Sequence, residues 1–130
     1  MRHSHPLPSL LALALLAVTP LAQAEIHAGG ISVEVRGEGR PVLMIPGLNS
    51  AAETWSDTCD ALQADGIQCH LVQLPGFAGL PARPQATGDD AEPFLPTMRD
   101  LLLDYIETAG LERPAVVGHS LGGMMALMLA

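Results

Sequence analysis

The chain has 130 residues, of which 48% are apolar and 15% are charged, and its formal net charge is −8 at neutral pH. This length accommodates one domain of ordinary size, and the apolar content excludes an intrinsically disordered chain. The acidic balance argues against nucleic acid as a partner, because nucleic acid is itself negatively charged.

Residues 1–24 predict a signal peptide. Arg2 supplies a positive start, residues 10–18 are an uninterrupted apolar run, and Ala22-Gln23-Ala24 matches the small-x-small pattern of a cleavage site. The apolar run is shorter than the ~20 residues that a bilayer-spanning helix needs. We therefore expect cleavage after Ala24, export to the periplasm or the extracellular space, and no stable membrane anchor afterwards. The alternative is an uncleaved anchor.

Residues 25–130 are expected to form the folded part, with five arginines, fourteen acidic residues and a formal charge of −9. Within it, Ile31–Gly37 alternates apolar and polar residues, which predicts a half-buried strand. After a glycine-rich turn, Val42–Ile45 are four consecutive apolar residues between two prolines. Such a run is typical of a strand that is covered on both faces, as in a parallel sheet.

A helix is predicted to begin at Ser50, because Ser50–Glu53 fits the S-x-x-E capping box. Trp55, Cys59 and Leu62 then fall on one face of that helix, and Gly66 is expected to follow its end.

The next strand is predicted at Ile67–Leu74, and Pro75–Pro96 is rich in proline, glycine and aspartate, as in a long loop. Apolar residues at helical spacing then lead to Gly110, Ala115–Val117 predicts a third buried strand, and Leu121 begins a helical stretch. Strands that alternate with helices predict an α/β fold, with a mostly parallel sheet and flanking helices.

The two cysteines, Cys59 and Cys69, are expected to have a structural role. In an exported protein they either form a disulfide or remain two buried thiols. No further ligands of the CxxC type accompany them in the sequence, so we expect neither a metal site nor a cofactor.

Gly118-His119-Ser120-Leu121-Gly122 is a G-x-S-x-G motif between a predicted strand and a predicted helix. Side chains at the two glycine positions would collide with a sharp turn at this point. The turn would expose the serine hydroxyl and leave the Leu121 N–H unpaired at a helix N-terminus, where negative charge is stabilised. The alternative is a glycine-rich loop with a solvated serine.

This motif and two earlier segments resemble the α/β-hydrolase family. "VVGHSLGG" resembles the family's nucleophile elbow, "VLMIPGLN" its oxyanion loop, and "LVQLPGFAGLP" its D-x-P-G-x-G-x-S segment. The three appear in family order, so the resemblance covers the chain from the first predicted strand to its last residue.

The resemblance implies that Ser120 is the nucleophile and that the backbone N–H groups of Leu48 and Leu121 form the oxyanion hole. It also argues against the dehalogenase and epoxide-hydrolase branches, which use aspartate in place of the serine. What it implies is attack on the acyl carbon of a small-molecule substrate, with a carboxylic ester as the first candidate, and hydrolysis of an acyl-enzyme.

The family order places an acidic residue and then a histidine after the serine, but residues 121–130 contain no ionisable side chain. Of the histidines outside the signal peptide, His27 lies near the new N-terminus, His70 is interpreted as structural, and His119 occupies the variable position of the elbow. We therefore expect an N-terminal portion of a longer hydrolase, nearly inactive by itself. The alternatives are a short non-catalytic binding module and a complete hydrolase with an improvised base.

Overall fold

The computed structural model describes residues 24–84, 88 and 91–130, so the expected signal peptide lies outside the described residues except for Ala24. The strands are β1 (Ala24–Ile26), β2 (Ser32–Arg36), β3 (Arg40–Ile45), β4 (Ile67–Gln73) and β5 (Ala115–Gly118). The α-helices are α1 (Ser56–Gln63), α2 (Phe94–Thr108) and α3 (Leu121–Leu129), and two short 3₁₀ helices are η1 (Ala28–Gly30) and η2 (Ala52–Trp55).

The five strands form one sheet in the order β1-β2-β4-β3-β5. β3 pairs in parallel with both β4 and β5, whereas β2 pairs antiparallel with both β1 and β4. The predicted α/β fold with flanking helices is confirmed, and its sheet is mixed. A parallel centre is extended on one side by two antiparallel strands.

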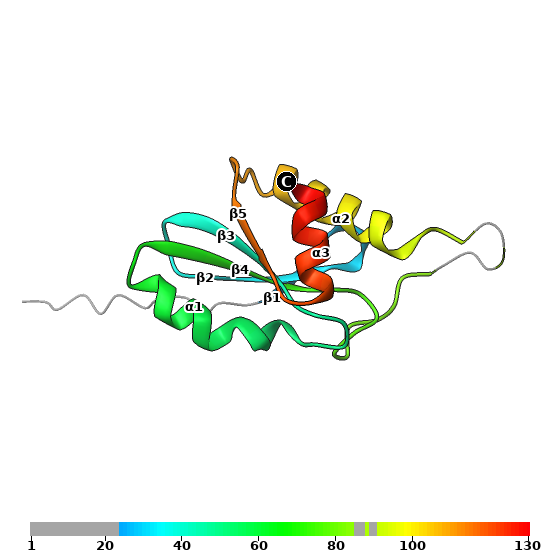
Figure 1. The fold of residues 1–130 in the computed structure, drawn as a ribbon, viewed down its shortest axis with the longest axis horizontal. Helices are drawn as coiled ribbons and strands as arrows, with labels where there is room; N and C mark the ends of the chain where they lie inside the picture. Colours follow the sequence, from blue (N-terminus) through cyan, green and yellow to red (C-terminus); the bar gives the residue numbers. More distant parts are fainter. Residues whose placement is uncertain (1–23, 85–87, 89–90) are drawn as a thin grey trace, which may run out of the picture.

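Helices cover both faces of this sheet (Figure 1). α1 packs on one face, over a cluster that includes Met44 and Leu71, and α2 and α3 pack on the other face, over a cluster that includes Leu43 and Val72. Neighbouring residues of one strand thus enter opposite clusters, as the two-residue period of a strand requires. This double coverage explains why β3 and β4 appear in the sequence as runs without a polar face.

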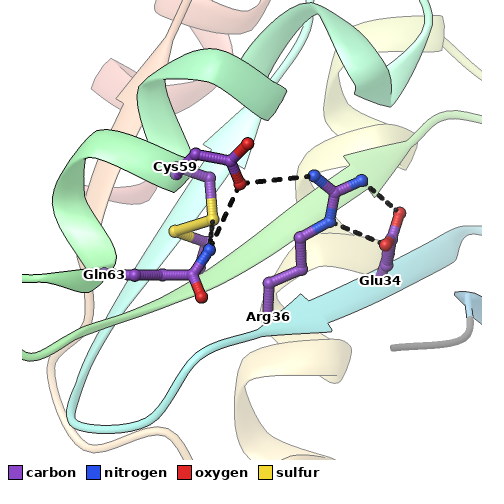
Figure 2. Close-up of polar contacts among 6 residues, drawn as sticks. Glu34, Arg36, Cys59 and Gln63 are labelled. Carbon is purple, nitrogen blue, oxygen red and sulfur yellow. Dashed lines mark hydrogen bonds and ion pairs between the residues drawn. A yellow bond between two sulfur atoms is a disulfide. The ribbon is translucent and has the colours of Figure 1, made fainter. Parts of the chain in front are cut away.

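The face under α1 also carries the polar and covalent links of that helix (Figure 2). Cys59 of α1 and Cys69 of β4 form a disulfide, with Cα atoms 6.0 Å apart. On β2, the Arg36 guanidinium donates to both carboxylate oxygens of Glu34, at 2.7 and 3.1 Å, and lies 4.0 Å from Asp60 of α1. The disulfide closes a short loop and contributes about 3 kcal/mol to stability. The ion pairs, close to the surface, add less than about 1 kcal/mol each.

The start of α1 differs from the prediction. The chain enters a 3₁₀ turn at Ala52 and becomes α-helical only at Ser56, and the N-cap residue is Ala51, without a side-chain cap. The capping box predicted from Ser50 is therefore wrong. Ser50 instead closes a turn, in which its N–H donates to the Gly47 carbonyl at 3.1 Å.

α2 begins at Phe94, two residues before the predicted loop ends. Pro96 lies in its first turn, where a missing N–H costs nothing. β1, a strand of three residues, was not predicted, because its residues flank the expected cleavage site and show no clear alternation. No helix in the described parts of the chain is long and apolar enough to cross a membrane.

β5 is less buried than predicted. It is the outer strand of the described sheet, and α3 covers one of its faces, so Val117 keeps 38% of its surface exposed. α3 itself has apolar residues on every side, and Met124 and Leu127 are 53% and 80% exposed. The elements around the predicted motif thus present an apolar surface to solvent in the described part of the chain.

Candidate active site

The parallel strands bring three loops to one edge of the sheet, beyond the carboxyl ends of β3, β4 and β5. After β3 the chain enters α1 on one face, and after β5 it enters α3 on the opposite face. Neighbouring strands whose connections leave to opposite faces create a crevice, and open α/β sheets bind their ligands there. The loop after β3 and the turn after β5 lie at this crevice, because Ile45 pairs with Gly118 at the ends of their strands.

Ser120 occupies the sharp turn that the motif predicts. Two residues separate the end of β5 from the start of α3, and Ser120 has φ 52° and ψ −116°. A non-glycine residue in such a conformation costs about 1–3 kcal/mol, and strain of this kind gathers at functional sites. The turn is closed by hydrogen bonds from Gly122 N to the His119 carbonyl and from Gly123 N to the Ser120 carbonyl, both 2.9 Å. Ser120 is exposed.

The glycines flanking the serine are required by close backbone contacts. A Cβ atom at Gly118 would collide with the carbonyl of Gly122, and one at Gly122 would collide with the carbonyl of Ile45. Gly123, by contrast, has room, because the nearest atom to an added Cβ would be 3.4 Å away. The first two positions therefore fix α3 against β5 and β3, as the motif predicts, and the third does not.

The loop after β3 lies beside the serine. A Cβ atom added to Gly47 would be 3.5 Å from the Ser120 Cβ and 3.0 Å from the His119 Nδ1. Asn49 has a positive φ of 59° in the Gly47–Ser50 turn. Among the described residues, no hydrogen bond uses the N–H of Leu48 or of Leu121. Two unpaired backbone donors thus flank Ser120, one adjacent in sequence and one in a contacting loop.

The histidines do not supply a base to this serine. No hydrogen bond joins the His119 ring to the Ser120 hydroxyl in the described part of the chain. His70 is buried, with Nδ1 2.6 Å from the Tyr105 hydroxyl and Nε2 3.1 Å from the Gln68 side chain. Burial lowers the pKa of His70, as expected for a structural imidazole.

His70 and Tyr105 belong to a separate cavity of about 410 Å³, which Glu25 and His27 also line. Burial raises the pKa of Tyr105 to about 12, and the charge of Glu25 adds to the shift. The ring of His27 meets the ring of Tyr105 edge to face, at 4.7 Å between centroids. Ser120 does not line this cavity, and within residues 24–84 and 91–130 no three His, Cys, Asp or Glu side chains form a metal-binding group.

One residue of this edge, Gln73, was not predicted from the sequence. Gln73, the last residue of β4, accepts a hydrogen bond from the N–H of Ala52 at 2.8 Å, and its amide nitrogen lies 3.3 Å from the Phe77 carbonyl. The sequence does mark this position, because Gln73 stands where the family segment D-x-P-G has its aspartate. The partner, 21 residues away, could not be read from local spacing.

The chain is similar to known proteins in sequence and in fold. Residues 42–130, more than half of the chain, match the alpha/beta hydrolase family. The protein named "Putative carbamate hydrolase RutD" from Azorhizobium caulinodans is 31% identical over 107 residues, which are 80% of this chain and 37% of the relative. A pimeloyl-(acyl-carrier protein) methyl ester esterase from Vibrio atlanticus is 29% identical over 96 residues, or 74% of this chain and 33% of that protein.

Among solved structures, an epoxide hydrolase from an endophytic Streptomyces superposes with a TM-score of 0.70 at 27% identity, over 85% of this chain and 32% of that one. This chain thus spans about a third of the length of the curated relatives it matches. The matched region contains β3 from Val42 onward, β4, β5 and the turn that carries Ser120. The chain belongs to the α/β-hydrolase family.

Proposed function

We propose that these residues form the nucleophile and oxyanion-hole part of an exported serine hydrolase that cleaves carboxylic esters. The observation that carries the proposal is the strained, exposed Ser120 in a two-residue turn, in contact with the Gly47 loop. A strained backbone that exposes one hydroxyl beside two unpaired N–H groups suits attack on a carbonyl carbon.

The chemistry would proceed in two steps. The Ser120 oxygen attacks the acyl carbon, its proton passes to a base, and the resulting oxyanion accepts hydrogen bonds from the N–H groups of Leu48 and Leu121. The tetrahedral intermediate releases the alcohol, which takes up the proton, and leaves an acyl group on the serine. Water then attacks the acyl-enzyme, releasing the carboxylic acid and restoring the hydroxyl.

The base and the acid are proposed to come from residues C-terminal to Ala130 in the full-length gene product. In the described part of the chain, no hydrogen bond connects the Ser120 hydroxyl to a histidine or a carboxylate. The exposed apolar residues of α3 and β5 support the same view, because surfaces of this kind are typically covered by further protein.

An acyl substrate is favoured over an epoxide. The two curated relatives are named for a carbamate and for a methyl ester, both of which present an acyl carbon. Epoxide hydrolases share the fold, but the family resemblance implies that they use an aspartate nucleophile at the position where this chain has Ser120. The full-length product is therefore expected to hydrolyse a p-nitrophenyl ester and to leave styrene oxide unchanged.

Export is proposed on the signal-peptide pattern of residues 1–24, and the Cys59–Cys69 disulfide is compatible with an oxidising compartment. Expression of the gene with its native leader tests this proposal. We expect the mature protein outside the cytoplasm, with an N-terminus at Glu25. An unprocessed N-terminus in the cytoplasmic fraction would contradict it.

The decisive experiment is active-site labelling. A fluorophosphonate probe should attach to Ser120 of the full-length product, as located by peptide mass spectrometry, and Ser120→Ala should abolish labelling. Absence of labelling in the folded wild type would favour a non-catalytic binding module. Undiminished turnover of the ester by the Ser120→Ala variant would exclude this serine as the nucleophile.

A further inference from the structure

The loop that carries the Leu48 N–H, residues 46–51, has little structure of its own. Its one internal hydrogen bond among the described residues joins Ser50 N to the Gly47 carbonyl, at 3.1 Å. At one end, Gly47 packs against His119 and Ser120. The direction of the Leu48 N–H therefore depends on how the other end of the loop is held.

That other end is the start of η2 at Ala52. The first N–H groups of a helix lack partners within the helix and are usually satisfied by a side chain just before it. Here the N-cap residue is Ala51, which has no polar side chain. The Ala52 N–H donates instead to the Gln73 Oε1, at 2.8 Å, from the end of β4.

The amide nitrogen of Gln73 holds the same junction from the other side. It lies 3.3 Å from the Phe77 carbonyl, and 3.5 Å from the carbonyls of Ser50 and Leu74. The bond to Ala52 is well within hydrogen-bonding range, whereas the 3.5 Å contacts are at its outer limit and contribute little. One planar group thus accepts a hydrogen bond from the first residue of η2 and donates to the loop after β4.

Glutamine is the side chain that fits both contacts. A carboxylate can accept from Ala52 but cannot donate to a carbonyl, and a leucine can do neither. Asparagine carries the same amide on a side chain that is one methylene shorter, so it cannot reach from the same backbone position. Gln73 also lines a cavity of about 280 Å³, which leaves room for a substituted side chain.

We propose that Gln73 is a positioning residue for the oxyanion hole, acting through its hydrogen bond to the Ala52 N–H. This inference rests on the proposed function, because it concerns the donor that Leu48 presents to the oxyanion. With the bond in place, residues 46–51 are fixed at both ends, and the Leu48 N–H is held within the loop that contacts Ser120. Without it, the loop is anchored only at Gly47, and the donor is misdirected in part of the population.

The test compares Gln73→Leu and Gln73→Asn with the wild-type full-length product. Removing one oxyanion donor typically lowers kcat by 10²–10³, so a donor displaced part of the time should lower kcat for a p-nitrophenyl ester by about tenfold. KM is expected to stay within about twofold, because the donor acts mainly in the transition state. Hydrogen exchange at the Ala52 amide should accelerate about tenfold, because its acceptor is lost.

Gln63→Leu is the matched control, since Gln63 lies on α1 and its side-chain amide, among the described residues, hydrogen-bonds to Cys59 and Asp60 and not to Ala52 or residues 46–51. It should leave kcat and Ala52 exchange unchanged.

Gln73→Glu keeps the acceptor for Ala52 and should retain slow exchange of the Ala52 amide and most of the rate of fluorophosphonate labelling. This variant decides the question if the other two do not fold. A Gln73→Glu protein with fast Ala52 exchange and slow labelling would overturn the assignment of the acceptor.

The two proposals fail in different ways. If the wild type itself resists the fluorophosphonate probe, the proposed function fails whatever Gln73 does. If the wild type labels at Ser120 and the Gln73→Leu and Gln73→Asn variants label as fast as Gln63→Leu, the role of Gln73 is overturned and the proposed function stands.

Discussion

The two sides of β3 are built by different means. On one side, β2, β4, η2 and α1 (the disulfide side) are joined by the Cys59–Cys69 bond, the Arg36 ion pairs and the hydrogen bond from Ala52 to Gln73. On the other, β5 and α3 (the elbow side) form no side-chain hydrogen bond among the described residues and rely on backbone contact at Gly118 and Gly122.

Each side supplies one half of the candidate site. The disulfide side carries the loop with Leu48, and the elbow side carries Ser120. The contrast teaches that opposite kinds of substitution should damage the two halves of the candidate site. The disulfide side should lose stability when a partner atom is removed, because each of its bonds joins two particular side-chain or backbone groups. The elbow side should suffer when an atom is added, because its backbones already touch.

The largest effect is expected on the elbow side, from Gly122→Ala. The added Cβ would collide with the Ile45 carbonyl and approach the Pro46 carbonyl to 2.6 Å. We expect the free energy of unfolding of the protein to fall by about 3 kcal/mol, and fluorophosphonate labelling to be lost. Denaturant unfolding and labelling kinetics measure the two.

Gly123→Ala is the control for that substitution. Its Cβ would be in ordinary contact, 3.4 Å from the Gly118 carbonyl oxygen, and alanine favours the helix by up to about 1 kcal/mol. It should leave labelling intact. Equal tolerance of alanine at both positions would show that backbone contact does not define the elbow side.

The next effect is expected on the disulfide side, from the double variant Cys59→Ala with Cys69→Ala. Opening this short loop should lower the free energy of unfolding by about 3 kcal/mol, as much as Gly122→Ala, but should leave the folded molecules able to react with the probe. A reductant should lower the midpoint of the wild type and leave the double variant unchanged. Identical midpoints for the oxidised wild type and the double variant would contradict the comparison.

The smallest effect concerns the pH dependence of stability and comes from His70, on the face of β4 under α2. Because it changes the stability of the whole fold, it should affect the disulfide side and the elbow side alike. Burial lowers the pKa of folded His70, whereas the unfolded chain keeps a value of about 6.5. As the pH falls below about 6.5, the unfolded state binds the proton first, so stability decreases, by at most about 1.4 kcal/mol per pH unit. Above that pH the full stability is retained.

His70→Gln removes the titration while keeping a polar side chain opposite Tyr105. Denaturant unfolding at pH 7.5 and 5.5 should show a smaller pH dependence in this variant than in the wild type. Parallel pH profiles for the two proteins would show that another group is responsible.

The sequence predicted the features that depend on local pattern. The apolar runs of β3 and β4 are direct consequences of double coverage, and Gly118 and Gly122 mark the elbow because no other residue fits there. The apolar run of Ala115–Val117 predicts a buried strand, but the length of such a run does not tell which neighbours cover the faces of the strand. The acceptor of the Ala52 N–H was not predicted for a related reason, since Gln73 reaches Ala52 only after the sheet has assembled.

The pairing of Ile45 with Gly118, and the hydrogen bond of 3.1 Å from His119 N to the Ile45 carbonyl, make the geometry of the candidate site depend on the alignment of β3 with β5. A slip of a single residue between β3 and β5 would shift Ser120 by about 3.3 Å and turn alternate side chains to the wrong face. Molecules trapped in such a slipped state would be compact yet unreactive. The fraction of a refolded sample that reacts with an active-site probe would therefore count the chains whose central strands have aligned.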